Sequence, residues 1–274
     1  MKKLLILFTI FCLITTFVTA QRKRKNRGHR NIMNYRVLKE SNHCGVDNAF
    51  IFIARDQKTF ANFPINLSEK IDFSREAVVG FFAGTKPTMG YRVQVSAADG
   101  MVSGNVQAPP SDAIVAEVLT SPCKVVAVAI PEDRPLLIKA SSDWKMSEYK
   151  VSKGKIEYSG GFAPRQKSYD VEGKIFSLAS GNLITLIFEL NAKGDPKIRL
   201  YEAVSGLLEN SSVNLNRVDP GGFSEHPRPF MKATGTLSAE KLSLKFEPNP
   251  TMVINDGFQA EGFIEAIRIK TTSR

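Results

Sequence analysis

The sequence has few histidines and cysteines, two of the residue types that enzymes often use for chemistry. It contains only three histidines, His29, His43 and His226, and they lie in different segments of the 274-residue chain. No G-x-S-x-G nucleophile motif, P-loop or dinucleotide-binding fingerprint occurs. A metal site needs clustered ligands, and Cys44 beside His43 is only a pair of neighbours. We therefore predict that the protein is not an enzyme and has no catalytic residues, cofactor or metal.

Long apolar runs are also scarce, and only the N-terminal one stands out. Two lysines precede the apolar run Leu4–Phe17, and Val18-Thr19-Ala20 has the residue sizes of a cleavage site. The run is shorter than the roughly 20 apolar residues that span a bilayer. Residues 1–20 are therefore predicted to be a cleavable signal peptide, with an uncleaved signal anchor as the alternative. The expected location is periplasmic, cell-surface or extracellular.

Cysteine is rare, and its use agrees with export. Cleavage of the signal peptide removes Cys12 and leaves Cys44 and Cys123 as a pair. In an oxidising compartment such a pair is a disulfide candidate. Two buried free thiols are the alternative.

Basic residues outnumber acidic ones, but they are concentrated in one place. Of the formal net charge of +10, two charges leave with Lys2 and Lys3, and six lie between Arg22 and Arg30. The rest of the chain carries only about +2, which argues against a basic domain face that binds nucleic acid. Residues 21–32 are predicted to be a basic linker. The alternative is weak contact with anionic lipid headgroups or cell-wall polyanions.

The first half of the chain has the patterns of short strands. Apolar runs and apolar–polar alternation predict strands over 49–54, 78–83, 91–95, 101–106 and 124–130. Asp56 is placed to cap a short helix that reaches Phe60. Asp99-Gly100 is typical of a hairpin turn. The segment Ser111–Leu119 is ambiguous, because its β-branched apolar residues fit one face of a helix as well as a buried strand.

The second half is predicted to be a separate β domain. Proline and charge at Pro131–Pro135 indicate a boundary, and Ser211–Pro229 is polar enough to be a long loop. Trp144, the single tryptophan, is predicted to be a core or rim residue, with a ligand-stacking ring as the alternative. Further strands are predicted over 169–178, 183–190, 198–203, 231–237, 242–246 and 258–269. The fold class is therefore mainly β, with a small β-rich domain over 33–131 and a β-sandwich or barrel over 132–274.

Two blocks of the first half resemble a known family. Gly84–Val95 reads GTKPTMGYRVQV and resembles the G-x-x-P-T-G-G-Y-x-(I/V)-x-(I/V) stretch of the PrcB C-terminal domain family. Thr120–Val126 resembles the family's later T-x-P-Y-x-(I/V)-V stretch, and the resemblance covers about residues 42–131. Met89 stands where the family has its second glycine, and Cys123 stands where it has an aromatic residue.

The resemblance implies a function in binding. Family members are secreted or surface-associated bacterial proteins, and some are accessory subunits that assemble with and stabilise an extracellular serine protease. It therefore implies a protein partner, such as an extracellular protease, that docks on the turn formed by Pro87, Thr88, Met89, Gly90 and Tyr91. A plain hairpin turn with a core aromatic residue is the alternative for these positions. For the whole protein, the alternative is a small-ligand or glycan-binding role of the second β domain.

Overall fold

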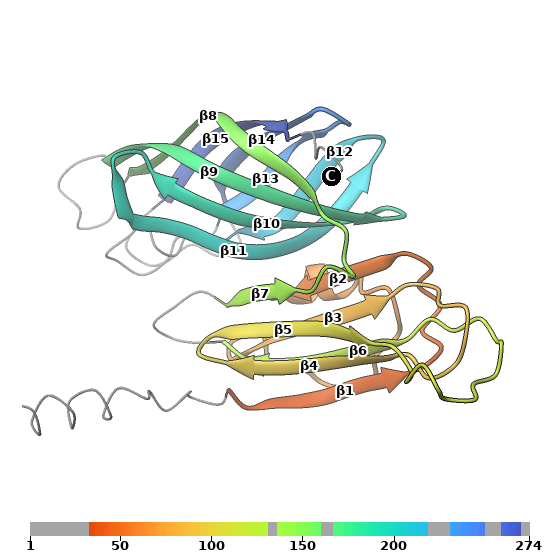
Figure 1. Ribbon diagram of the computed structural model, residues 1–274. Helices are drawn as coiled ribbons and strands as arrows, with labels where there is room; N and C mark the ends of the chain where they lie inside the picture. Colours follow the sequence, from red (N-terminus) through yellow and green to blue (C-terminus); the bar gives the residue numbers. More distant parts are fainter. Residues whose placement is uncertain (1–32, 131–135, 160–166, 219–230, 250–258, 270–274) are drawn as a thin grey trace, which may run out of the picture. The chain divides into compact units, whose positions relative to one another are not determined.

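The computed structural model describes residues 33–130, 136–159, 167–218, 231–249 and 259–269 (Figure 1). The predicted signal peptide, the basic linker and the predicted boundary at Pro131–Pro135 lie outside these ranges. All described residues belong to one compact unit, Met33–Arg274. Their regular structure is almost entirely β, which confirms the predicted fold class.

The N-terminal part consists of two sheets. The first sheet is antiparallel and has the order β1 (Tyr35–Ser41), β6 (Cys123–Ala129), β3 (Glu76–Ala83) and β2 (Ala49–Ala54). The second has the order β4 (Arg92–Ala98), β5 (Met101–Gln107) and β7 (Leu137–Ala140). The predicted Asp99-Gly100 turn joins β4 to β5, and both of its residues have positive φ.

Close packing between the two sheets forms the first core. A Cβ at Gly104 of β5 would come within 2.2 Å of the Phe81 ring of β3, so only glycine lets the sheets approach this closely. Trp144 is 1% exposed, and its Nε1–H donates to the carbonyls of Phe50 and Phe82 at 3.2 and 2.9 Å. It is a core residue, as predicted, and its ring is not exposed to a ligand. Both β7 and Trp144 follow the predicted domain boundary in sequence, yet they pack with strands that precede it.

An exposed ion pair crosses the first sheet from β1 to β3. Arg36 holds both carboxylate oxygens of Glu76, at 3.2 and 3.1 Å, and thereby keeps the pKa of Glu76 below its usual 4.5. A carboxyl group whose pKa is lowered by folding stabilises the protein above its unfolded pKa, and that contribution is lost as the pH falls through its folded pKa.

We expect Glu76→Gln to lower the free energy of unfolding by about 0.5 kcal/mol at neutral pH, because both side chains are partly exposed to water. Urea unfolding at pH 7 and at a pH well below 4.5 measures this. The difference from the wild type should disappear in acid, and a difference that persists there would contradict the role of the ion pair.

The C-terminal part is a closed, eight-stranded antiparallel barrel, so the predicted sandwich or barrel is a barrel. Each strand pairs with its sequence neighbours, and β15 closes the ring on β8. Fully buried apolar side chains such as Ile156, Phe188 and Phe246 fill its core. The strands are β8 (Ser147–Ser159), β9 (Lys167–Ser180), β10 (Leu183–Ala192), β11 (Asp195–Glu209), β12 (Ser212–Val218), β13 (Met231–Leu237), β14 (Lys241–Pro248) and β15 (Gln259–Arg268).

Four barrel glycines lie where a neighbouring strand comes very close. Gly173, Gly206, Gly235 and Gly262 lie on β9, β11, β13 and β15. At each of them a Cβ would come within 1.9–2.2 Å of a carbonyl oxygen of a neighbouring strand. A larger residue cannot fit without moving a strand, and the barrel therefore depends on glycine at these positions.

Sequence patterns miss two barrel strands. The predicted loop Ser211–Pro229 is wrong in its first part, because Ser212–Val218 is β12, and the remainder lies outside the described residues. In β8 the buried positions change phase, from Tyr149 and Val151 to Ile156 and Tyr158, across an irregularity in its pairing with β9. A strand that changes phase does not alternate regularly, so periodicity does not reveal it.

The barrel covers the edge of the first sheet. β2 is an edge strand, and such strands leave backbone groups without a ladder partner. Here two buried barrel hydroxyls satisfy them. The Ile53 N–H donates to Ser205 Oγ at 2.8 Å, and Thr185 Oγ1 donates to the Ile51 carbonyl at 2.5 Å.

A buried ion pair ties the end of β2 to the barrel wall. Arg55 Nη1 lies 2.8 Å from Glu202 Oε1, and the two side chains are 6% and 0% exposed. Glu202 shares one face of β11 with Leu200 and Val204, which belong to the barrel core. Arg55 reaches Glu202 at a part of β11 that is not paired with β12, because β11 pairs with β12 only over Leu207–Glu209.

Asp56, the residue after Arg55, caps the predicted short helix, α2 (Gln57–Phe60). Asp56 Oδ1 accepts from the Thr59 N–H at 2.8 Å, which confirms the predicted cap. The same oxygen accepts from Asn216 Nδ2 of β12 at 3.0 Å, and Arg217 donates to the Arg55 carbonyl at 2.7 Å. The Arg55-Asp56 corner is therefore bonded to both β11 and β12.

Candidate protein-docking surface

The predicted docking turn lies between β3 and β4. Pro87, Met89 and Gly90 are exposed, and Thr88 and Tyr91 are partly exposed. Gly90 has φ +93°, a conformation that favours glycine and agrees with the tight turn expected from the sequence. Lys86 Nζ lies 5.8 Å from the centre of the Tyr91 ring, in reach of a cation–π contact.

A second segment, residues 113–119 of the connection between β5 and β6, lies on this turn. Sequence patterns did not assign it to the site. Lys86 and Thr120 exchange both of their backbone hydrogen bonds, at 2.7 and 3.0 Å. The Thr120 hydroxyl donates to the Thr88 carbonyl at 3.0 Å, and the Met89 N–H donates to the Ala116 carbonyl at 3.1 Å. The connection between β5 and β6 is therefore fastened to the turn, beyond the ends of the strands (Figure 1).

Gly90 provides room for this segment. A Cβ there would lie 2.9 Å from the Pro109 Cβ and 3.4 Å from Val115 Cγ1. The left-handed backbone and the tight space both oppose a side chain at this position. The turn and the segment therefore require glycine at residue 90.

Apolar side chains on the turn and the segment project into solvent. Ile114 is fully exposed, Leu119 is 69% exposed, Val118 is 49% exposed and Met89 is 38% exposed. We call these four residues the docking surface. Clustered exposed apolar residues are typical of surfaces that bind another protein. Sequence periodicity predicted a helix or a buried strand over Ser111–Leu119, and neither forms: residues 113–119 have no regular structure.

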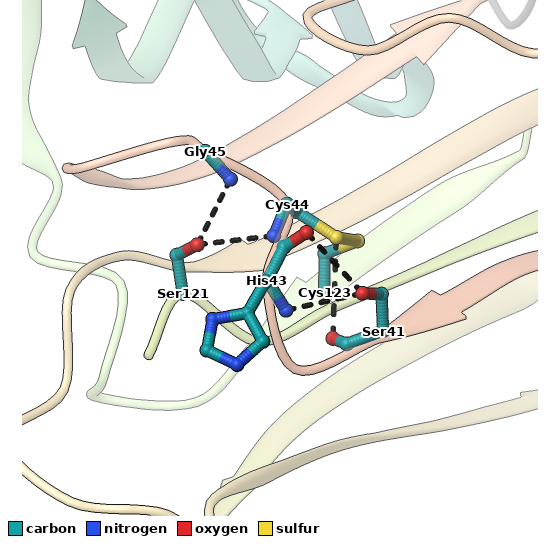
Figure 2. Close-up of a disulfide and its surroundings, with 6 residues drawn as sticks. All are labelled: Ser41, His43, Cys44, Gly45, Ser121 and Cys123. Carbon is teal, nitrogen blue, oxygen red and sulfur yellow. Dashed lines mark hydrogen bonds between the residues drawn. A yellow bond between two sulfur atoms is a disulfide. The ribbon is translucent and has the colours of Figure 1, made fainter. Parts of the chain in front are cut away.

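A disulfide fixes the chain next to the segment (Figure 2). The structure joins the predicted pair Cys44 and Cys123, whose Cα atoms are 6.0 Å apart. Ser121 Oγ accepts from the amides of Cys44 and Gly45 at 3.0 and 2.9 Å. The loop that carries Cys44 is thus held against the residues that end the segment.

The stretch between the start of β3 and the end of β6 contains the turn, the segment and Cys123. Residues 77–129 match the family model described as PrcB C-terminal. The match includes all four residues of the docking surface and falls inside the 42–131 range of the sequence resemblance. No curated protein and no solved structure matches the chain.

Other kinds of site find little support among the described residues. There, no group of three or more histidine, cysteine or acidic side chains could hold a metal ion. His43 is exposed beside the disulfide, and His29 and His226 lie outside the described ranges. No helix in the part of the chain that the structure describes is long and apolar enough to cross a membrane.

A ligand-binding role of the barrel would need a pocket. Buried side chains fill the barrel core, but an open groove of about 580 Å³ lies on the outer face of β13–β15 and includes Phe263. Two of its carboxylates, Glu157 and Glu265, are bound by Lys155 and Lys241 at 2.6 and 3.1 Å. Those two carboxylates are therefore already engaged within the chain.

Proposed function

We propose that this is an exported, non-enzymatic accessory protein that binds a protein partner through the docking surface and stabilises a protease complex. The observation that carries the proposal is the exposure of four apolar side chains on a hydrogen-bonded support, inside the stretch that matches the PrcB C-terminal family. The disulfide and the predicted signal peptide support export, because disulfides persist in oxidising compartments.

A photocrosslinking residue placed at Met89 tests the proposal in the native envelope. The matched control carries the same residue at Thr236, which is exposed on the outer face of the barrel. Crosslinks from position 89 to a protease or to a subunit of its complex, and none from position 236, are the expected outcome. Equal labelling from both positions, or no labelling from position 89, would contradict the assignment of this surface.

We expect Leu119→Asp to weaken partner binding by about tenfold or more, because a carboxylate loses hydration when an apolar surface closes over it. The free protein should keep its stability, since Leu119 is 69% exposed. Binding is measured by co-purification of the partner, and stability by thermal unfolding. Thr236→Asp is the control, and it should leave both unchanged.

A further inference from the structure

We infer that residues 113–119 bind an edge strand of the partner protein by backbone pairing, in the manner of an added β-strand; the inference rests on the proposed function and specifies how the partner is held. The segment reads AIVAEVL, with β-branched residues at Ile114, Val115 and Val118. Such residues favour strands, yet the segment has no regular structure in the free chain.

The turn beside the segment explains why it pairs with no strand among the described residues. Antiparallel pairing begins at the bridge between Lys86 and Thr120. Continuing it would require residues 87–90 to run alongside the segment, but Pro87 has no N–H and Gly90 turns the chain with φ +93°. Pairing therefore stops after the bridge, apart from the single bond from Met89 to Ala116.

Backbone groups consequently remain available along the segment. Within the described residues, the amides of Ile114, Val115, Ala116, Glu117 and Leu119 donate to no backbone carbonyl. Exposed, unpaired backbone beside apolar side chains is what an incoming strand recognises: the main chain gives affinity and the alternate side chains give specificity. The bonds from Met89 and Thr120 hold the segment in place, and the bond from the Val118 N–H to the Ala116 carbonyl, which bends the segment at Glu117, must open when a strand pairs there.

Charge indicates what the incoming strand carries. Ile114, Val118 and Leu119 call for apolar side chains, and Glu117 is the only charged residue between 113 and 119. In an antiparallel pair of two copies centred on Ala116, the two Glu117 carboxylates would lie diagonally opposite on one face, where like charges repel. A different protein whose edge strand has apolar residues and a lysine or arginine near Glu117 therefore fits better than a second copy.

Proline at residue 117 tests backbone pairing separately from side-chain contact. Glu117→Pro removes an amide that donates to no carbonyl among the described residues, and Glu117→Ala removes only the exposed carboxylate. Each variant carries the photocrosslinking residue at position 89 and is expressed in the native envelope. Unchanged thermal unfolding of both purified variants shows that the fold is intact.

We expect the crosslinking yield to fall about tenfold or more with Glu117→Pro and no more than a few-fold with Glu117→Ala. Equal, near-wild-type yields from both variants would overturn backbone pairing while leaving the proposed function intact. The absence of any crosslink in the wild type would overturn both. A product with the mass of two copies of this chain would overturn the assignment to a different protein.

Discussion

Replacing Arg55 with alanine is expected to lower the free energy of unfolding by about 3–5 kcal/mol, one of the two largest effects we predict for a change in this chain. The substitution leaves Glu202 as a carboxylate whose side chain is 0% exposed and which has lost its guanidinium partner. Removing one member of a buried ion pair costs more than the pair contributes, because the remaining charge stays out of water. Urea unfolding measures the change.

A double substitution distinguishes loss of the pair from loss of packing. Arg55→Met with Glu202→Leu removes both charges and keeps apolar volume, so we expect it to recover most of the lost stability. Lys245→Ala, which removes an exposed pair with Glu247, is the control and should change stability by less than about 1 kcal/mol. A loss below about 1 kcal/mol for Arg55→Ala would show that the buried pair contributes little.

The same contacts predict how the chain unfolds. Arg55 and Asp56 are bonded to β11 and β12, and barrel hydroxyls complete the edge of β2. Unfolding either part alone would leave these buried groups unsatisfied. In the urea experiment, the wild type should therefore unfold in one transition.

Removing the disulfide with Cys44→Ala and Cys123→Ala is expected to destabilise the protein by about 4 kcal/mol, because the bond closes a loop between residues 79 apart in sequence. The bond restricts the unfolded chain, and longer loops lose more entropy when they are closed. Thermal unfolding of the oxidised wild type and of the double variant measures the difference.

Reduction provides the matched control. Dithiothreitol should lower the stability of the wild type and leave the double variant unchanged. A reductant effect of equal size on both proteins would show that the bond is not the cause. The disulfide also borders Ser121, which is bonded to the amides of Cys44 and Gly45, so partner binding through the docking surface should weaken in the same samples.

Local patterns were sufficient for much of the N-terminal part. Apolar runs located β2, β3 and β6, and the Asp56 cap, the Asp99-Gly100 turn and the Cys44–Cys123 pair were all found from residue type and spacing. These features depend on residues that are close in sequence or on a chemistry that few residues share. The exposed turn around Gly90 was predicted for the same reason, because proline and glycine restrict the backbone locally.

Patterns failed where the outcome depends on distant residues. Residues 113–119 have the composition of a buried strand, but the turn at Pro87–Gly90 provides no continuous backbone for them to pair with. β12 contains polar residues because Asn216 and Arg217 bond to the Arg55-Asp56 corner, so it resembles a loop. Composition shows which side chains can be buried and does not show whether a partner is present.

By itself, the sequence predicted a mainly β chain, a short capped helix, a disulfide candidate and a tight turn, because each follows from local conformational preference or from residue chemistry. Only the tertiary structure decided that the second set of strands closes into a barrel, that Arg55 meets Glu202 across 147 positions, and that an apolar segment stays exposed beside the turn. Those outcomes depend on which distant backbone and side-chain groups meet, and periodicity along the chain carries no such information.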